Sequence, residues 1–341
     1  MSRQTLAYLG WHGRGNFGDD LIYEAWKSAL PNYELVTAPL YKSDLKGKIL
    51  QALRLRFSRQ VAGILVGGGT VIGFANWARH IRRAQLLYGH RSVLLVGAGA
   101  AAYDDKKASQ LQSLDWEAWK SIPGLKIAGV RGPLSQDALE RQGLASEIVG
   151  DPALLFSRRT PLPSSEVLGL SVGNGHGSAF DIGVLARAAT DWALANPGRS
   201  LAIFTLAAED KETVAAFDAL VPASVPRRVI TYAGQDVLMV LDEIALCAVF
   251  ISERLHGAIA AASMEVPAIS LSYLSKCDDF MRSIGRGAFV VKDDLTSDEL
   301  IVLVERAQTG PDGSRAETRA LRERLVMHLS PLPINRTEMT L

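Results

Sequence analysis

The sequence predicts an α/β protein with two Rossmann-like domains, each built on a parallel β-sheet, facing each other across a cleft. Short β-rich apolar runs alternate with helical stretches along most of the chain, a spacing typical of βαβ units. A length of 341 residues suits two domains of ordinary size. Hydrophobic residues make up 48% of the chain and charged residues 21%, so two sizeable cores can be filled.

The first series of elements occupies residues 1–156, which we expect to form the N-terminal domain. Its expected strands are Thr5–Gly10, Glu34–Thr37, Val61–Val66, Ser92–Val96 and Lys126–Val130. Its expected helices are Asp20–Leu30, Asn76–Tyr88, Ala108–Lys120 and Pro133–Gln142. Strands that are separated by helices must run parallel, because the helix returns the chain to the starting edge of the sheet.

A second series fills residues 166–312, after a Pro- and Ser-rich stretch at 157–165 that indicates a linker. Its expected strands are Val167–Val172, Ser200–Leu206, Arg228–Tyr232, Ala248–Ile251, Ala268–Ser272 and Ala288–Val291. Its expected helices are Asp181–Ala195, Asp210–Leu220, Asp236–Cys247, His256–Met264, Asp278–Ile284 and Ser297–Gln308. The segment 313–341 holds a charged amphipathic helix, Ser314–Leu329, and a tail whose prolines stop that helix.

Charge and cysteine content set limits on partners and location. The net charge of +1 gives no general attraction to nucleic acid, so no nucleic acid partner is expected. The two cysteines, Cys247 and Cys277, cannot build a disulfide framework, which fits a reducing compartment. No signal-peptide core is visible, and no apolar run approaches the ~20 residues of a membrane span. We therefore expect a cytoplasmic protein.

Absent motifs exclude several site types. No G-x-x-x-x-G-K-[ST] loop occurs, so a P-loop NTPase is excluded. The Gly-x-Ser-x-Gly elbow is also absent, which argues against an α/β-hydrolase. The six histidines show no H-E-x-x-H or comparable spacing, so no metal site is expected.

The most informative motif is Ser252–His256, at the junction between an expected buried strand and the next helix. In open α/β sheets, ligands bind at this edge. The guanidinium of Arg254 offers a fork of donors that suits phosphate or carboxylate, and His256 can transfer a proton near neutral pH. Lys276 follows the next strand and adds a third basic group. Together these residues predict a pocket for a small, multiply charged anion.

A glycine-rich turn follows the first strand. Gly13, Gly15 and Gly18 fit the spacing G-x-G-x-x-G, a weak dinucleotide signal. Asp19 and Asp20 open the next helix, where their charges would repel a pyrophosphate. Three interpretations stay open: a loop that shapes a binding site, a tight turn with an aspartate cap, and a dinucleotide site.

Two further strands end in glycines, at Gly67–Thr70 and Gly97–Gly99, and glycine there lets a ligand approach backbone N–H groups. Close packing of helix on strand is the alternative. Arg131 also follows a strand, and we expect it to bind an anion, with an exposed surface arginine as the alternative. Asp151 lies in a turn at the domain boundary and is expected to cap rather than catalyse.

Taken in order, these motifs resemble the polysaccharide pyruvyl transferase family over roughly residues 6–290. The matching segments are Gly15–Asp20, Gly67–Thr70, Arg131 with Ser135 and Gly143, Gly150–Ala153, Ser252–His256, Val266–Pro267 and Tyr273–Lys276. The resemblance implies a two-domain fold like that of the GT-B glycosyltransferases. It implies a phosphoenolpyruvate donor, a saccharide acceptor that is free or lipid-linked, and a pyruvate ketal product with release of phosphate. Such enzymes decorate exopolysaccharides or cell-wall polymers, and no cofactor is implied.

We expect the N-terminal domain on the acceptor side and the C-terminal domain on the donor side. His256 is the expected general acid or base, and Asp19 or Asp20 would orient or deprotonate the acceptor. The expected catalytic residues are His256, Arg254, Asp19 and Asp20. The expected donor-binding residues are Arg131, Arg254, Leu255, His256 and Lys276. The expected cleft loops contain Gly15, Asn16, Gly18, Gly67, Gly68, Gly69, Thr70, Asn174 and His176.

The chain departs from the family pattern at two places. Asp19-Asp20 replaces a more usual Asp-Glu pair, and the loop Gly173–Gly177 lacks an arginine found in many members. His176 is expected to substitute for that arginine or to contact the acceptor. A GT-B glycosyltransferase that uses a nucleotide sugar and a non-catalytic sugar-binding protein both stay open as alternatives.

The stretch Lys42–Arg59 contains six basic residues and one acidic residue, Asp44. Ile49, Leu50, Leu53 and Phe57 share one helical face. One interpretation is peripheral contact with the inner face of an anionic membrane that carries a lipid-linked acceptor. The other is a solvated basic face with an apolar stripe against the core.

Overall fold

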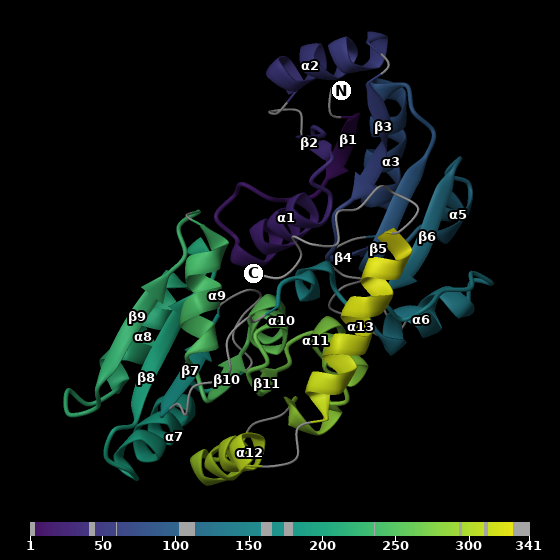
Figure 1. The fold of residues 1–341 in the computed structure, drawn as a ribbon. Coiled ribbons are helices and arrows are strands. Elements are labelled where there is room, and N and C mark those ends of the chain that lie inside the picture. The colour runs from purple at the N-terminus through teal and green to yellow at the C-terminus, as the bar shows by residue number, and fades with distance from the viewer. Residues whose placement is uncertain are drawn as a thin grey trace. The chain divides into compact units, whose positions relative to one another are not determined.

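The computed structural model divides into two compact units, which are described separately. It describes residues 4–40, 45–58, 60–101, 113–157, 166–173, 180–234, 236–292, 295–309 and 313–329. Within that range, the first unit consists of Gln4–Trp11, Ile22–Leu155 and Leu321–Leu329, and the second of His12–Leu21 and Phe156–Ala320. Two parallel-sheet α/β units were predicted, and the structure confirms them (Figure 1).

The first unit contains a parallel six-stranded sheet in the order β2–β1–β3–β5–β4, with β6 also paired to β5. Its strands are β1 (Gln4–Leu9), β2 (Tyr33–Thr37), β3 (Val61–Val66), β4 (Thr70–Ile72), β5 (Val93–Ala100) and β6 (Leu125–Val130). The strand order reverses between β1 and β3, because β2 lies on one side of β1 and the later strands lie on the other. Ligand sites favour the carboxyl ends of strands at such a switch point, where Gly67–Gly69 follow β3.

The first unit also contains several helices, of which α3 packs an apolar stripe on the sheet. They are α2 (Leu45–Phe57), α3 (Ala75–Tyr88), α5 (Trp116–Lys120), α6 (Pro133–Glu140) and the 3₁₀ turn η2 (Pro152–Leu155). Helix α3 buries Trp77, Ala78, Ile81, Ala84 and Tyr88, which recur at helical spacing. It ends at Gly89, whose left-handed φ of 67° suits a C-terminal cap.

The second unit contains a parallel sheet in the order β12–β11–β10–β7–β8–β9. Its strands are β7 (Val167–Ser171), β8 (Ser200–Thr205), β9 (Arg227–Thr231), β10 (Val249–Ser252), β11 (Ala268–Leu271) and β12 (Val290–Val291). Numbered from β7, this is the Rossmann order 3-2-1-4-5-6, with the switch point between β7 and β10. The motif Ser252–His256 leaves β10 at that switch point.

The second unit contains helices and two 3₁₀ turns, and aspartate side chains cap α7 and α9. They are α7 (Ile182–Leu194), α8 (Lys211–Leu220), α9 (Val237–Ala245), α10 (Leu255–Ser263), α11 (Ser275–Ser283), α12 (Ser297–Thr309), α13 (Ser314–Leu329), and the 3₁₀ turns η3 (Ala208–Asp210) and η4 (Gly287–Phe289). The side chains of Asp181 and Asp236 accept hydrogen bonds from the first turns of α7 and α9. In α10, alanine and glycine are buried at five positions, which lets this helix approach the sheet closely.

Helix α1 (Phe17–Ala29) and helix α13 each contribute residues to both units. Residues 17–21 of α1 belong to the second unit and the rest to the first. Leu321–Leu329 of α13 belong to the first unit, where Arg322 Nε donates to the Leu154 carbonyl oxygen at 2.6 Å. The two units differ from the predicted domain limits at these two helices, because residues 12–21 belong to the second unit and Leu321–Leu329 to the first. The predicted limits of the domains therefore stay a prediction.

Some predicted elements need correction. The strand expected at Ala288–Val291 is only Val290–Val291, because Gly287–Phe289 form a 3₁₀ turn. Helix α11 starts at Ser275 rather than Asp278, and β4 (Thr70–Ile72) was not predicted, since three residues carry little periodicity. The helix expected from Ala108 is described only over Trp116–Lys120. Most of the predicted linker, residues 158–165, lies outside the described residues.

Candidate functional site

The first turn of α1 is anchored in the second unit. Asn16 Oδ1 accepts a hydrogen bond from the N–H of Gly18 at 3.0 Å, which caps the helix. The N–H of Phe17 donates to the Leu206 carbonyl oxygen at 2.9 Å, and Asn16 forms an antiparallel bridge with Ala207. The segment that carries Asp19 and Asp20 is therefore fixed beside the carboxyl end of β8.

The carboxylate of Asp20 is buried and oriented on both oxygens. The hydroxyl of Tyr232 donates to Asp20 Oδ2 at 2.7 Å, and the N–H of Gly13 donates to Oδ1. Tyr232 also packs edge-on against the Phe17 ring, with centroids 5.5 Å apart. Asp19 is half-buried, so of the two acidic side chains it has more access to solvent.

His256 lies against the same turn. It is the second residue of α10, and its imidazole is so close to Gly18 that an added Cβ would overlap Nδ1 and Cγ of the ring. Only glycine leaves room for the imidazole at that position. The structure thus brings His256 together with the segment that contains Asp19 and Asp20, which are more than 230 residues earlier in the chain.

Arg254 is the N-cap residue of α10 and is held by two carboxylates. Its Nε lies 3.0 Å from Asp210 Oδ2, and its Nη2 contacts Asp210 Oδ1 and lies 3.0 Å from Glu209 Oε1. Burial lowers the pKa of the Arg254 guanidinium, but the hydrogen bond and charge of Asp210 outweigh it and raise that pKa overall. The hydrogen bonds of Arg254 to other described residues use Nε and Nη2 and not Nη1.

Lys276 and Tyr273 lie near Arg254. The Nζ of Lys276 lies 4.9 Å from the centroid of the Tyr273 ring, and Tyr273 lies near the Arg254 guanidinium. On the side of β7, the N–H of Gly173 donates to Glu253 Oε2 at 2.8 Å. An added Cβ on Gly173 would lie 3.0 Å from Arg254 Nε. The switch point of this sheet therefore gathers two basic side chains, an imidazole and several carboxylates.

A row of three serines underlies this edge of the sheet. Ser171, Ser252 and Ser270 are in register across β7, β10 and β11, so their side chains emerge on one face. All three are buried, and Ser252 Oγ donates to the Arg254 carbonyl oxygen at 2.6 Å. That bond fixes the backbone where β10 turns into α10.

The first unit holds the other predicted residues. Arg131 is only 1% exposed, with Nη2 3.2 Å from Thr70 Oγ1 and its guanidinium packed against Gly99. Asp151 is fully buried, accepts from the N–H of Ala153 at 3.0 Å and so caps η2, as predicted. Burial raises the pKa of Asp151 to about 6, although the charge of Arg131 lowers it.

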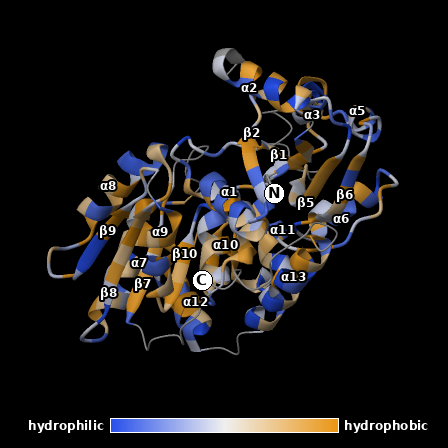
Figure 2. Ribbon diagram, turned by 45° about the horizontal axis from the view of Figure 1, so that its top comes forward, coloured by the Kyte–Doolittle hydropathy of each residue, from blue (hydrophilic) through white to orange (hydrophobic). Residues whose placement is uncertain are grey.

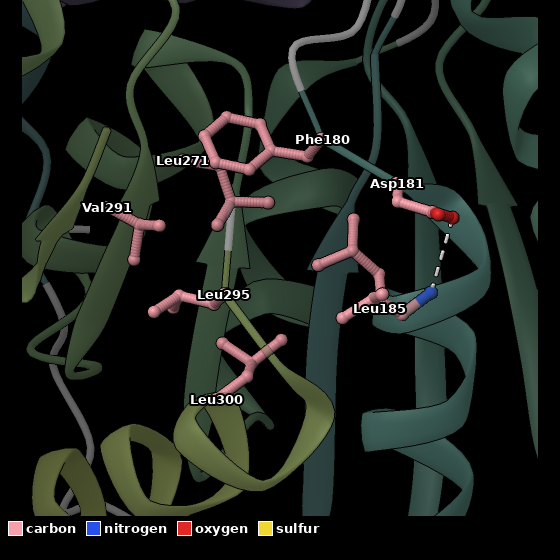
Figure 3. Close-up of a pocket in the computed structure, with 8 residues that line it drawn as sticks. Phe180, Asp181, Leu185, Leu271, Val291, Leu295 and Leu300 are labelled. Carbon is pink, nitrogen blue, oxygen red and sulfur yellow. Dashed lines mark hydrogen bonds between the residues drawn. The ribbon is translucent and has the colours of Figure 1, made fainter. Parts of the chain in front are cut away.

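An apolar cavity of about 230 Å³ lies elsewhere in the second unit (Figure 3). Its labelled lining consists of Phe180, Asp181, Leu185, Leu271, Val291, Leu295 and Leu300. Asp181 Oδ1 accepts from the N–H of Gly183 at 2.7 Å as the cap of α7. Among the described residues that line the cavity, none is basic.

The sequence profile of the polysaccharide pyruvyl transferase family matches residues 16–275. The chain belongs to this family. The match begins at Asn16, which caps the first turn of α1, and ends at Ser275, the first residue of α11. No curated protein sequence matches the chain.

Solved structures share the fold of this pyruvyl transferase family member at low sequence identity. MnaA of S. aureus, solved with UDP, is 10% identical over 96% of both chains with a TM-score of 0.60. The UDP-N-acetylglucosamine 2-epimerase of Rickettsia bellii is 8% identical over 97% of both chains, with a TM-score of 0.55. The glycotransferase of kitacinnamycin is 14% identical over 96% of both chains, with a TM-score of 0.52. These likenesses confirm the predicted GT-B-like fold.

The structure places the predicted site residues in two groups. Gly15, Asn16, Gly18, Asp19, Asp20, Arg254, Leu255, His256 and Lys276 lie in the second unit. Gly67, Gly68, Gly69, Thr70 and Arg131 lie in the first. Asn174 and His176 lie outside the described residues. The alternative interpretation of Arg131 as an exposed surface residue is wrong, since its side chain is buried.

Three residues of the candidate site were not predicted. Tyr232 follows β9 and Glu209 and Asp210 follow β8, so each lies at the same edge of the sheet as His256. The sequence could have indicated Glu209 and Asp210, because they follow a predicted strand and the carboxyl ends of parallel strands meet at one edge of the sheet. Tyr232 gave no such signal, since an aromatic residue at a strand end is usually part of the core. Within the described residues, no three His, Cys, Asp or Glu side chains group as a metal site.

Proposed function

We propose that this protein transfers the pyruvyl group of phosphoenolpyruvate to two hydroxyls of a saccharide, forming a cyclic ketal and releasing phosphate. The observation that carries the proposal is the packing of His256 against the acidic first turn of α1, with Arg254 at the start of the same helix as His256. An acid–base group, carboxylates and a cationic fork are what this reaction requires. Family membership supports the same reaction class.

The chemistry needs one protonation and two attacks by hydroxyl oxygens. A proton is added to the methylene carbon as the first hydroxyl oxygen bonds to the central carbon, which converts the double bond to a methyl group. The second hydroxyl oxygen then bonds to the same carbon as the carbon–oxygen bond to phosphate breaks. His256 is the proposed proton donor or the base towards a hydroxyl. Asp19 is the more accessible carboxylate to orient the acceptor, and Asp20 keeps the turn in place.

The donor anions are assigned to the start of α10. The guanidinium of Arg254, through Nη1, and the ammonium of Lys276 supply positive charge. The first N–H groups of α10 point out of the N-terminal end of the helix and add hydrogen-bond donors for an anion. Leu255 is 4% exposed, so its part in donor binding would come from its backbone rather than its side chain. The burial of Arg131 favours a role in positioning Thr70 over direct contact with the donor.

We also propose that the reaction needs no resident cofactor, because Arg254, Lys276 and the start of α10 offset the charge of the donor phosphate. Treatment with a chelator should then leave turnover unchanged, and loss of turnover that a divalent cation restores would overturn this point. A cytoplasmic site of action and a lipid-linked acceptor belong to the same proposal. No helix in the described part of the chain is long and apolar enough to cross a bilayer.

The test is to incubate the purified protein with phosphoenolpyruvate and a panel of synthetic or lipid-linked glycosides. Phosphate release together with a carboxyethylidene mass gain on the sugar would establish the reaction. Phosphate release without a modified sugar, or absence of both product and donor binding, would overturn it. Donor binding is followed independently by thermal shift.

A second candidate is a GT-B glycosyltransferase that uses a nucleotide sugar. It is favoured by the fold shared with MnaA, which was solved with UDP. Thermal shift with UDP-sugars against phosphoenolpyruvate distinguishes the two. A non-catalytic sugar-binding protein would bind glycosides without any turnover.

A further inference from the structure

Positive charge is concentrated in one part of the first unit. Residues 45–101 contain nine lysine and arginine residues and no aspartate or glutamate, although the whole chain has a net charge of only +1. The cations are Lys46, Lys48, Arg54, Arg56, Arg59, Arg79, Arg82, Arg83 and Arg91. Most of those in the described residues lie on α2 and α3, which pack beside each other.

Helix α2 presents apolar side chains to solvent rather than to the core. Leu50, Arg54 and Phe57 are spaced four and three residues apart, so they share one face. Leu50 is 63% exposed and Phe57 is 80% exposed, whereas Ala52 on another face is buried. The interpretation of this stripe as packed against the core is therefore wrong for Leu50 and Phe57.

Helix α3 continues the same kind of surface. Arg79, Arg83 and Leu86 are spaced four and three residues apart, all three are exposed, and Leu86 is 75% exposed. Arg56 Nη1 donates to the Leu86 carbonyl oxygen at 2.7 Å, which joins the ends of the two helices. Figure 2 shows α2 and α3 as neighbours, with hydrophobic and hydrophilic residues alternating along α2.

We propose that the α2–α3 surface, defined by Leu50, Arg54, Phe57, Arg79, Arg83 and Leu86, docks on an anionic lipid bilayer. Exposed aliphatic and aromatic tips insert among acyl chains, and the surrounding cations attract anionic headgroups. Nucleic acid would use the cations but would leave three large apolar side chains in water. The combination of positive charge and exposed apolar side chains therefore favours an anionic bilayer over nucleic acid as the partner of this surface. This inference does not depend on the proposed reaction.

The position of the surface is compatible with an active enzyme. Phe57 lies shortly before β3 and Leu86 shortly before β5, so the end of the surface formed by these two side chains adjoins the amino ends of these strands. The loop Gly67–Thr70 follows β3 at its carboxyl end, and a six-residue strand spans about 20 Å. Docking at the amino edge thus leaves the loops of the opposite edge uncovered.

The test is co-sedimentation of the full chain with vesicles of phosphatidylcholine, with and without phosphatidylglycerol. We expect binding only to the anionic vesicles at about 0.1 M salt and release at about 1 M salt, where the Debye length falls to about 3 Å. Arg54→Glu with Arg83→Glu should weaken binding by at least about tenfold, as expected for cations near a charged bilayer. The triple variant Leu50→Asn, Phe57→Asn and Leu86→Asn should weaken it by a similar factor.

The matched controls are Lys211→Glu and Val302→Asn, an exposed cation and an exposed apolar residue of the second unit. They should bind vesicles as the unchanged protein does. Equal losses in controls and test variants would overturn the proposal. So would binding of double-stranded DNA that competes with vesicles and survives the triple variant. Loss of self-association instead of vesicle binding would assign the surface to a second copy of the chain.

Discussion

The hydroxyl of Tyr232 donates a 2.7 Å hydrogen bond to the carboxylate of Asp20, across 212 positions of sequence. The second oxygen of that carboxylate accepts from the N–H of Gly13. Asp20 is therefore fixed in one orientation, and with it the first turn of α1 that faces His256. In the proposed reaction, Tyr232 is a positioning residue that acts through this turn.

Tyr232→Phe should lower kcat/KM for the acceptor by about tenfold, roughly the 1–2 kcal/mol of a hydrogen bond to a charged group. The donor KM should change little, because Arg254 and Lys276 stay in place. Steady-state kinetics with each substrate varied separately measures this split. Tyr88→Phe is the control, since Tyr88 is equally buried in the first unit and its hydroxyl has no hydrogen-bond partner in the described residues.

Gly18→Ala should abolish most activity while the protein stays folded. The added methyl overlaps the His256 imidazole, so the ring or the turn must move. Misplacement of a reacting group by about 1 Å costs on the order of 100-fold in rate. The control is Gly63→Ala, where an added Cβ meets its nearest atom at an ordinary 3.6 Å. Unchanged turnover in Gly18→Ala would separate His256 from the chemistry.

His256→Ala should keep the fold and lower kcat by about 10²–10⁴-fold, the usual span for a proton-transfer group. His256→Asn tests whether hydrogen bonding alone is enough. The pH dependence of kcat should lose one limb in both variants, a change that a purely structural role would not produce. Near-normal turnover with an unchanged pH profile would remove His256 from the mechanism.

The fold and half of the site followed from local patterns. Strands such as those ending at Val66 and Ser252 are visible in the sequence as apolar runs that stop at glycine or charged residues. The ends of these runs predicted the carboxyl edge of the sheet, where His256 and Arg254 lie. Tyr232 and Asp210 became visible only in three dimensions. Their partners, Asp20 and Arg254, are distant in sequence, and no periodicity encodes such pairs.

The α2 stripe shows the opposite difficulty. Leu50 and Phe57 fit a helical apolar face, and periodicity alone does not say whether that face meets a core or a partner. Burial decides the question, because Ala52 on another face is fully enclosed. The sequence pattern thus identified the apolar face of α2, but only the packing of neighbouring elements shows that this face points to solvent.

Asp151 should make stability depend on pH. Burial raises its pKa in the folded protein to about 6, above the ordinary value near 4, so the folded state holds this proton more tightly than the unfolded state. The resulting contribution of Asp151 to the free energy of unfolding is present in full below about pH 4. It is lost as the pH rises through about 6, which lowers the free energy of unfolding by about 3 kcal/mol. Asp151→Asn should flatten that part of the profile. Urea unfolding of both proteins at several pH values measures the difference, and parallel profiles would contradict it.

Arg254→Lys should raise the donor KM by about tenfold and change kcat less, although the positive charge is kept. Lysine has no planar fork, so it cannot hold Asp210 through two nitrogens and still present a third to a ligand. Arg227→Lys is the matched control, because Arg227 pairs with Asp218 in the same unit through the same kind of contact. An unchanged donor KM in Arg254→Lys would leave Arg254 as a support for Asp210 and η3 and would move the donor site away from the start of α10. A rise in donor KM that also appears in Arg227→Lys would instead mean that loss of stability, and not loss of a ligand contact, weakens binding.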